Sequence, residues 1–334
     1  MRLISQWLGV ISLFAGASAL AQNSTSTSQF IYNAYWSNSV GFQSKAELHN
    51  NSTLNALLVT PVLYDADGWS VQLDSIKLLP LANASIDVNA ELAAKGWGNR
   101  TAGTVAFQYS AGHTGVLEAE LYVSNVSKSL SFTIPSIEKA VASSAQHAVF
   151  WLSSGREEVY VALQNISGTA INVSPSLTMC GVTVALTQVQ LPPHGSSVLE
   201  LAKDTLPAAM AAMWQKDNVG GISVTQDGSA GALNTGGWAE DDNSGYSTTM
   251  TFQDPTVGRG RLLSTQILVG PAQSILNLDG PFVISSQLVL RNISDQPLDF
   301  HGELAFSNNG SLAKAAIPVT HMQAGEYSVL ISIC

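Results

Sequence analysis

The amino-acid sequence predicts an all-β protein built from tandem antiparallel β-sandwich modules. Apolar and polar residues alternate in short runs such as 70–76 and 182–186, which is the pattern of strands buried on one face. Turn-forming segments such as 65–68 (DADG) and 308–310 (NNG) separate the runs. Similar landmarks also recur along the chain in a constant order, which indicates an internal repeat.

Composition narrows the classes of function. The chain has 334 residues, of which 46% are hydrophobic and 11% are charged, against about 25% charged in an average soluble protein. Its net charge is −10, and it contains no run of Lys or Arg. Nucleic-acid binding requires a basic patch, so we expect no nucleic-acid partner.

The N-terminus resembles an export signal. Arg2 precedes a mostly apolar run over residues 3–17, and Ala19 and Ala21 are the small residues that a signal peptidase prefers. We therefore expect a signal peptide over residues 1–21 and a flexible leader over 22–29. The apolar run is too short for a spanning helix, and no later segment qualifies. The expected location is outside the cytoplasm: extracellular, at the cell surface or in the periplasm.

The repeat rests on two landmarks. The segments 48–52 (LHNNS), 163–167 (LQNIS) and 290–294 (LRNIS) share a central Asn and a following Ser, which stabilise bends by bonding to nearby backbone. About thirty residues later, 79–83 (LPLAN) aligns with 191–195 (LPPHG), and 322–325 (MQAG) is a weaker third copy. An apolar strand is expected after each copy, over 86–92, 198–201 and 327–333.

Two further elements complete the predicted module. A glycine landmark at 112–115 and again at 228–231 lies within a predicted hairpin, which in the first module runs from Gly103 to Val123. One short connector helix is expected over 207–216, where Pro207 precedes a run of helix-forming residues. The predicted modules are 30–140, 141–260 and 261–334, and the third is incomplete because it lacks the closing hairpin.

These motifs resemble an uncharacterised Ig-like β-sandwich repeat of secreted bacterial proteins. The resemblance lies in 63–68 (LYDADG), in 191–195 (LPPHG) and in the segment from Gly103 to Val123. It covers nearly all of the predicted mature chain. The resemblance implies Ig-like modules and no catalytic residue.

No enzymatic motif is present in the sequence. A nucleophile elbow, a P-loop and the HExxH and CxxC motifs are absent, and the six histidines are scattered. We therefore expect neither catalysis nor a cofactor. Cys180 lies in an apolar run typical of a core residue, while a disulfide between Cys180 and Cys334 stays open.

Two groups of residues are candidate binding sites. Glu240, Asp241 and Asp242 form the densest acidic cluster, which could hold Ca²⁺, although a solvated hairpin tip is the favoured interpretation. Trp97 and Trp238 lie next to glycines, and we expect them to be exposed in loops where they could stack on sugar rings. The other aromatic residues are expected in the core.

These observations favour a non-enzymatic exported protein that acts through its surface. The first hypothesis is a structural or adhesive β-sandwich protein whose partner is an unknown macromolecule. The alternative is a carbohydrate-binding module protein that uses Trp97 and Trp238. Exposed tryptophans distinguish the two hypotheses, because only the second requires them.

Overall fold

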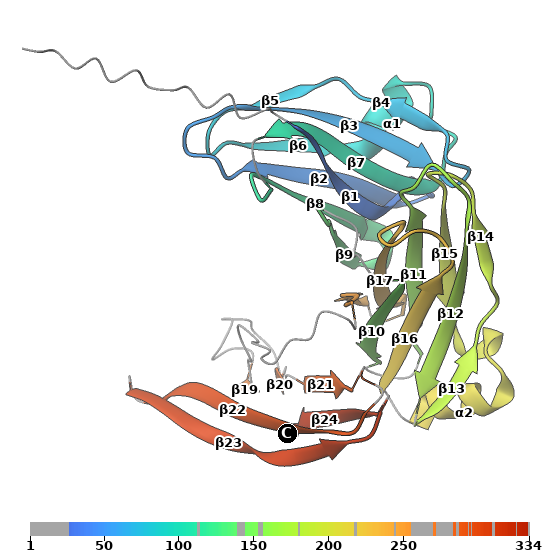
Figure 1. Ribbon diagram of the computed structural model, residues 1–334, viewed down its shortest axis with the longest axis vertical. Coiled ribbons are helices and arrows are strands. Elements are labelled where there is room, and N and C mark those ends of the chain that lie inside the picture. Colours follow the sequence, from blue (N-terminus) through green and yellow to red (C-terminus); the bar gives the residue numbers. More distant parts are fainter. Residues whose placement is uncertain are drawn as a thin grey trace, which may run out of the picture.

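The protein is described from a computed structural model. It describes residues 27–111, 114–138, 144–152, 156–179, 181–216, 219–243, 245–254, 270–271, 283–284, 287–292, 294, 296–308, 311–324 and 326–332. These residues form several antiparallel sheets and a few short helices (Figure 1). The predicted signal peptide and most of the leader lie outside the described residues.

The first two sheets, here called the first sheet pair, lie at the top of Figure 1. One sheet has the order β1-β7-β3-β4, with β5 also pairing with β3; the other has the order β6-β2-β8-β9. Their bounds are β1 Thr27–Ser37, β2 Phe42–Asn50, β3 Leu57–Asp65, β4 Ser70–Gln72, β5 Ile76–Leu78, β6 Asn83–Asp87, β7 Ala102–Ala111, β8 Leu117–Asn125 and β9 Leu130–Pro135.

The next two sheets, the second sheet pair, have the same strand order with each strand number raised by nine. One sheet runs β10-β16-β12-β13, with β14 pairing with β12, and the other runs β15-β11-β17-β18. Their bounds are β10 Ala145–Trp151, β11 Glu158–Asn165, β12 Ile171–Met179, β13 Val182–Ala185, β14 Val189–Leu191, β15 Ser196–Leu201, β16 Val219–Gln226, β17 Leu233–Asp241 and β18 Tyr246–Met250.

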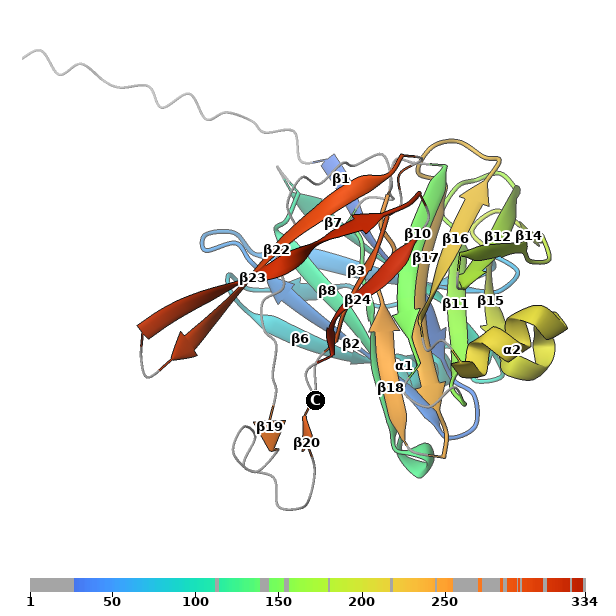
Figure 2. The same cartoon turned by 90° about the horizontal axis from the view of Figure 1, so that it is seen from below.

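The C-terminal strands form three strand pairs: β19 with β20, β21 with β24, and β22 with β23. Strand β21 contacts β10, and β24 contacts β16, so this part of the chain lies against the second sheet pair. The long strands β22 and β23 extend away from it (Figure 2). Their bounds are β19 Gly270–Pro271, β20 Val283–Ile284, β21 Gln287–Arg291, β22 Leu298–Asn308, β23 Ser311–Met322 and β24 Tyr327–Ser332.

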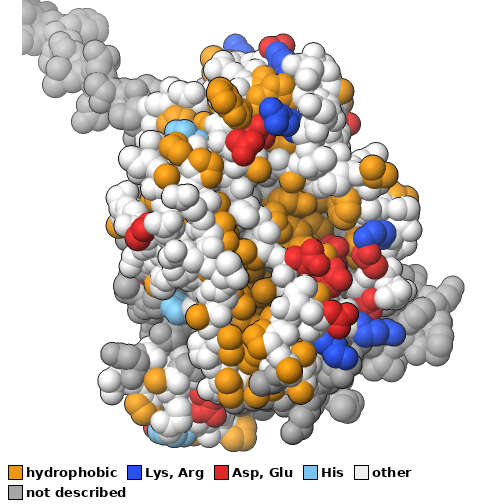
Figure 3. Space-filling view, turned by 90° about the vertical axis from the view of Figure 1, so that its right-hand side faces the viewer, with side chains coloured by type: hydrophobic (Ala, Val, Ile, Leu, Met, Phe, Trp, Pro, Cys, Tyr) orange, Lys and Arg blue, Asp and Glu red, His pale blue; other side chains and the backbone are white. Residues whose placement is uncertain are grey.

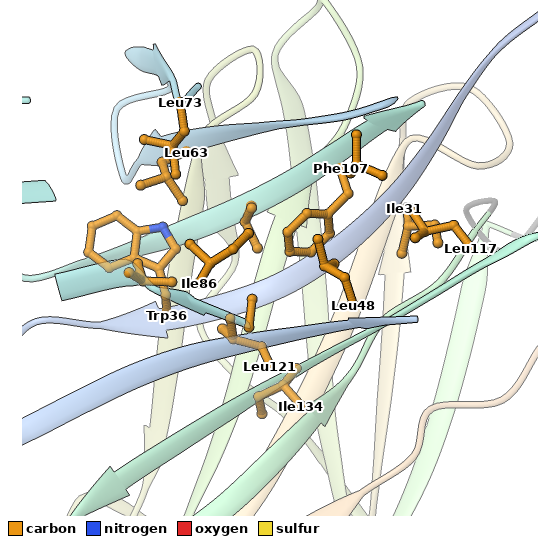
Figure 4. Packing of buried hydrophobic residues seen from close by; sticks show 14 of the residues in the cluster. Ile31, Trp36, Leu48, Leu63, Leu73, Ile86, Phe107, Leu117, Leu121 and Ile134 are labelled. Atoms are coloured by element: carbon orange, nitrogen blue, oxygen red, sulfur yellow. The ribbon is translucent and has the colours of Figure 1, made fainter. Parts of the chain in front are cut away.

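The core of the first sheet pair lies between its two sheets. Burial alternates along β2 and β3, as the period of two predicts, so one row of side chains from each strand points inward. Figure 4 shows Trp36 and Phe107 from one sheet opposite Leu48 and Leu121 from the other. A second hydrophobic cluster lies between the sheets of the second pair. Burial of these apolar faces is the main force that holds each sheet pair together.

Two helices occupy the same place in the two sheet pairs, whereas one was predicted. α2 (Ala208–Lys216) agrees with the expected helix and lies between β15 and β16. α1 (Val88–Ala94) lies between β6 and β7, so the strand expected over 86–92 is wrong. Asp87 ends β6 and caps α1, because its carboxylate accepts a hydrogen bond of 3.0 Å from the Ala90 N–H. Single turns of 3₁₀ helix, η1 (Val126–Lys128) and η2 (Lys203–Thr205), also occur.

The expected hairpin from Gly103 to Val123 is also wrong. Strand β7 pairs with β1 and β3, whereas β8 pairs with β2 and β9, so the chain crosses from one sheet to the other between them. Strands β16 and β17 do the same. Both connections carry a glycine with positive φ, Gly115 and Gly231, at equivalent places. Local sequence marks the turn but does not specify which strands pair across it.

The repeated Asn side chain forms the same hydrogen-bond network at all three positions. Asn165 is fully buried, and its Nδ2 donates to the carbonyls of Thr169, Leu191 and Pro192 at 2.7–3.4 Å. Its Oδ1 accepts from the N–H and the hydroxyl of Ser167 at 2.9 and 2.7 Å. The bend expected of this motif is therefore observed. The Asn165 side chain also bonds to the second landmark, the segment 191–195.

The other two copies confirm the arrangement. Asn50 donates to the carbonyls of Asn55, Leu78 and Leu79 at 2.8–3.3 Å. Asn292 donates to the carbonyls of Gln296, Met322 and Gln323 at 2.7–3.2 Å.

These bonds also correct the alignment of the second landmark. Asn50 and Asn165 bond to the carbonyls of Leu78 and Leu191 respectively, so Leu78 and not Leu79 is equivalent to Leu191. Both leucines are buried, whereas Leu79 is exposed. The sequence alignment was shifted by one residue because Leu79 and Leu191 both precede a proline.

Replacement of Asn50 by Ala should lower the free energy of unfolding by about 2–4 kcal/mol, because it leaves buried carbonyl groups without a donor. Asn51→Ala is the matched control, since the Asn51 side chain is exposed and donates a long bond of 3.3 Å to the Gly115 carbonyl. That change should cost less than about 0.5 kcal/mol. Urea unfolding of both variants measures the difference. Equal losses would show that the Asn network does not stabilise the fold.

Candidate functional site

The structure places Trp238 between the two sheet pairs, in a region here called the junction. Its ring stacks on Tyr35 and Phe132 of the first sheet pair, with centroids 4.6 Å away in each case, and on Tyr160 at 5.0 Å. Its Nε1 donates a hydrogen bond of 2.9 Å to Glu240. Only 3% of Trp238 is exposed, so the expectation that this ring lies in an exposed loop is wrong.

The glycines beside Trp238 were misread as loop residues. Gly236 and Gly237 lie within β17, a strand in which every residue is buried. A Cβ on Gly236 would lie 2.9 Å from Ile134 of the first sheet pair, so the absence of a side chain allows the two sheet pairs to approach closely. One face of β17 packs in its own core, and the other packs against the first sheet pair.

Polar side chains add specific contacts to the junction. Gln164 Nε2 donates to Thr104 Oγ1 of the first sheet pair at 2.8 Å, and Asn234 Nδ2 donates to Gln164 Oε1 at 2.9 Å. All three residues are buried. Buried polar groups with satisfied hydrogen bonds define one relative arrangement, because any shift would leave them without partners.

A turn of the second sheet pair docks on a turn of the first. The Ser196 N–H donates to the Ala66 carbonyl at 3.0 Å, and the ring of His194 stacks on Tyr64 at 5.5 Å. Gly68 has a φ of +85°, and a Cβ there would lie 2.1 Å from the Pro193 carbonyl oxygen. Only glycine fits this position, for both reasons.

The predicted acidic cluster lies at the same junction, but its carboxylates have separate partners. Glu240 accepts from Trp238, Asp242 forms an ion pair with Lys128 of the first sheet pair, and Asp241 accepts a bond of 3.0 Å from the Asn243 N–H. Among the described residues no three His, Cys, Asp or Glu side chains come together as a metal-binding group. The calcium site stays a prediction that this arrangement does not favour.

Burial raises the pKa of Glu240 from its ordinary value of 4.5 to about 7. The negative charges of Asp242 and Glu158 raise it further, whereas the Trp238 hydrogen bond and the positive charge of Lys128 oppose the shift. The phenol of Tyr160 donates to Glu158 at 2.5 Å, and burial together with these carboxylates raises the pKa of Tyr160. The junction thus holds a carboxyl group that titrates near neutral pH.

Trp97 is half-buried against the core of the first sheet pair. The Arg100 guanidinium lies 5.6 Å from its ring centroid and 3.3 Å from the Asp65 carboxylate, so one approach to the ring is occupied. Among the tryptophans whose side chains the structure describes, Trp69 is the most exposed, at 68%. It follows the turn in which Asp65 accepts bonds of 3.0 Å from the N–H groups of Asp67 and Trp69. The sequence analysis did not single out Trp69. Its position directly after the DADG turn could have indicated that its ring is exposed.

Two shallow hollows lie at the end of the first sheet pair away from the junction, beside the loop after β2, and both are lined in part by Asn51 and Gly115. Elsewhere, Figure 3 shows broad apolar areas on one face, with Asp and Glu side chains gathered near its middle and Lys and Arg side chains close to them and towards the top. Extended contact surfaces suit macromolecular partners better than small ligands.

Comparison with known proteins identifies no relative: the chain matches no protein-family model, no curated protein and no solved structure. Within the described residues, no helix has the length and apolar character needed to cross a bilayer. Cys180 and Cys334 both lie outside the described residues, so their pairing stays open.

Replacement of Trp238 by Ala should lower the free energy of unfolding by about 3–5 kcal/mol, because it removes a large ring from a buried stack. The loss should also uncouple the sheet pairs, so that urea unfolding shows two transitions. Trp69→Ala is the control, and it should cost less than about 0.5 kcal/mol because its ring is exposed. Similar losses in the two variants would contradict the role of the stack.

The shifted pKa of Glu240 predicts a pH dependence of stability. Between pH 4.5 and about 7 the folded protein holds a proton that the unfolded chain has lost, so stability falls as the pH rises through this range. Glu240→Gln removes this titration and should flatten the profile between these limits. The measurement is the free energy of unfolding in urea at several pH values. An unchanged slope in the variant would rule out Glu240 as its source.

Proposed function

We propose that this chain is an exported, non-enzymatic protein that acts as a rigid structural or adhesive unit. In this proposal the sheet pairs are tandem Ig-like modules over 30–140 and 141–260, and 261–334 is a third, incomplete module. The same strand order in both sheet pairs supports this division. The Asn network at all three positions supports it as well.

The observation that carries the proposal is the junction. Stacked rings, buried hydrogen bonds and a docked turn join the two sheet pairs, whereas flexible linkers are usual between independent modules. A rigid array holds its surfaces at fixed spacing, which is useful for adhesion and of little use to an isolated binding pocket. Export, as the residues at 1–21 predict, would place these surfaces outside the cell.

Adhesion can be tested with beads coated with the mature protein. We expect the beads to be retained on cells of the producing organism, and we expect soluble mature protein to compete in a saturable way. Beads coated with the same protein after heat denaturation are the control. Retention no higher than on the denatured beads would contradict an adhesive role.

A second candidate function is carbohydrate binding, and one observation favours it. The exposed ring of Trp69 offers the free face that stacking on a sugar requires, with Trp97 and Arg100 in the same part of the first sheet pair. Trp238 cannot serve, since it is buried. A glycan array would then show a preference that Trp69→Ala abolishes and Trp97→Ala weakens. Binding that both variants retain would exclude this function.

A further inference from the structure

Three leucines are exposed on two turns at the end of the first sheet pair that is farthest from the junction. Leu54 lies in the loop after β2 and is 84% exposed, and Leu79 and Leu81 lie between β5 and β6 and are 59% and 56% exposed. We call this region the leucine end. Large apolar side chains grouped on turns are uncommon on a soluble surface, and they mark interaction sites.

The two turns form one rigid platform. The Leu81 N–H donates to the Ser52 carbonyl at 3.1 Å, and Asn50 bonds to the carbonyls of both Asn55 and Leu79. Neither turn carries a charge: residues 51–56 read NSTLNA and residues 79–82 read LPLA. The leucines are therefore held in place on an uncharged surface.

The fold itself does not require these leucines. At the equivalent positions the second sheet pair has Pro192 for Leu79 and His194 for Leu81. Leu81 has a φ of +56°, a left-handed conformation that is unfavourable for a bulky residue and that Asn or Gly would adopt more easily. The loop with Leu54 is also one residue longer than the equivalent loop of the second sheet pair. Asn50 bonds to the carbonyl of Asn55, five residues later, whereas Asn165 bonds to the carbonyl of Thr169, four residues later.

A second copy of this chain cannot dock at the leucine end through contacts equivalent to those that join the two sheet pairs at the junction. The face of the second sheet pair that meets the first carries small or neutral side chains, with Ala162 paired opposite Gly236. On the first sheet pair the equivalent position holds Glu47 opposite Glu120, both exposed. Docking there would bury both carboxylates together with Lys45, which forms an ion pair with Glu47, and the burial of these charges is unfavourable.

The position of the N-terminus points to a membrane. Strand β1 begins at the leucine end, because Thr27 pairs with Ala111 at the end of β7, close to Val116, whose carbonyl accepts from the Asn51 N–H at 2.7 Å. The chain before Thr27 contains the apolar run over 3–17 that predicts export through a membrane. While this segment is still attached it joins the folded chain at the leucine end, so this end then faces the bilayer that the segment enters.

We propose that the leucine end docks on a lipid bilayer, with Leu54, Leu79 and Leu81 inserted among the acyl chains at the interface. Burial of leucine side chains is favourable and independent of charge. With a net charge of −10 the protein gains nothing from anionic lipid. Binding should thus occur on zwitterionic vesicles and depend little on salt. The choice of a bilayer rests on the proposed export, whereas vesicle binding is measured apart from adhesion, so the two proposals can fail separately.

The test is flotation of the mature protein with phosphatidylcholine vesicles. We expect the wild type to float with the vesicles and the triple variant Leu54→Gln, Leu79→Gln, Leu81→Gln to lose at least about tenfold in partitioning. The double variant Val40→Gln, Val126→Gln is the matched control, since these valines are 101% and 81% exposed on turns at the opposite end. It should bind as the wild type does.

Each other outcome overturns the proposal. Absence of wild-type binding, equal binding by the triple variant, or equal loss in the valine control would each exclude insertion by these leucines. Binding only to phosphatidylglycerol vesicles, lost at high salt, would indicate an electrostatic mechanism instead. Sedimentation velocity without vesicles completes the test: self-association that the triple variant abolishes, without vesicle binding, would assign the leucine end to a second copy. Matching circular dichroism spectra confirm that the variants are folded.

Discussion

A single buried asparagine closes one end of each sheet pair, and the rest of the architecture depends on it. The chain crosses from one sheet to the other three times at this end, between β2 and β3, between β5 and β6 and between β7 and β8. Asn50 bonds to carbonyl groups on the first two crossings, and Asn165 does the same between β11 and β12 and between β14 and β15. One side chain thus satisfies backbone groups that two sheets cannot satisfy by themselves at the point where the ladders end. A sheet pair without this link would have an open end with buried, unpaired carbonyls.

The junction uses the rigidity that this link provides. The turn of the second sheet pair that docks on the first begins directly after Pro192, whose carbonyl Asn165 holds. A turn held at both ends loses little further conformational freedom on docking, so more of the contact energy is retained. The junction also restricts which residues strand β17 can contain. With one face in its own core and the other against the first sheet pair, it tolerates only side chains that suit two neighbours at once.

Local chemistry explains which features could be predicted from sequence. The Asn–Ser turns and the helix that ends at Lys216 depend on near neighbours, and the structure has them where expected. The two alternating runs fit less well, because residues 70–76 form a strand only over Ser70–Gln72 before β5 begins at Ile76, and β13 has no buried residue. Most errors involve distant contacts, but one is local. Strands β7 and β8 look like a hairpin until their partners are known. The helix α1 was missed although its cap is local, because Asp87 lies inside an apolar run that resembles a strand. Trp238 looked exposed because glycines flank it, but glycine also permits close packing, and only the first sheet pair distinguishes the two cases.

The buried asparagines have a consequence for how the protein can be produced. Asn50, Asn165 and Asn292 each stand two residues before a serine, so all three match the acceptor sequence for N-linked glycans. In a eukaryotic secretory pathway this modification reaches the chain before the sheets close. A glycan on Nδ2 would occupy the atom that makes three buried hydrogen bonds and would not fit a residue that is 0–1% exposed. A bacterial host without that glycosylation machinery avoids this trap, whereas yeast or mammalian secretion would yield chains blocked at the step on which their folding depends.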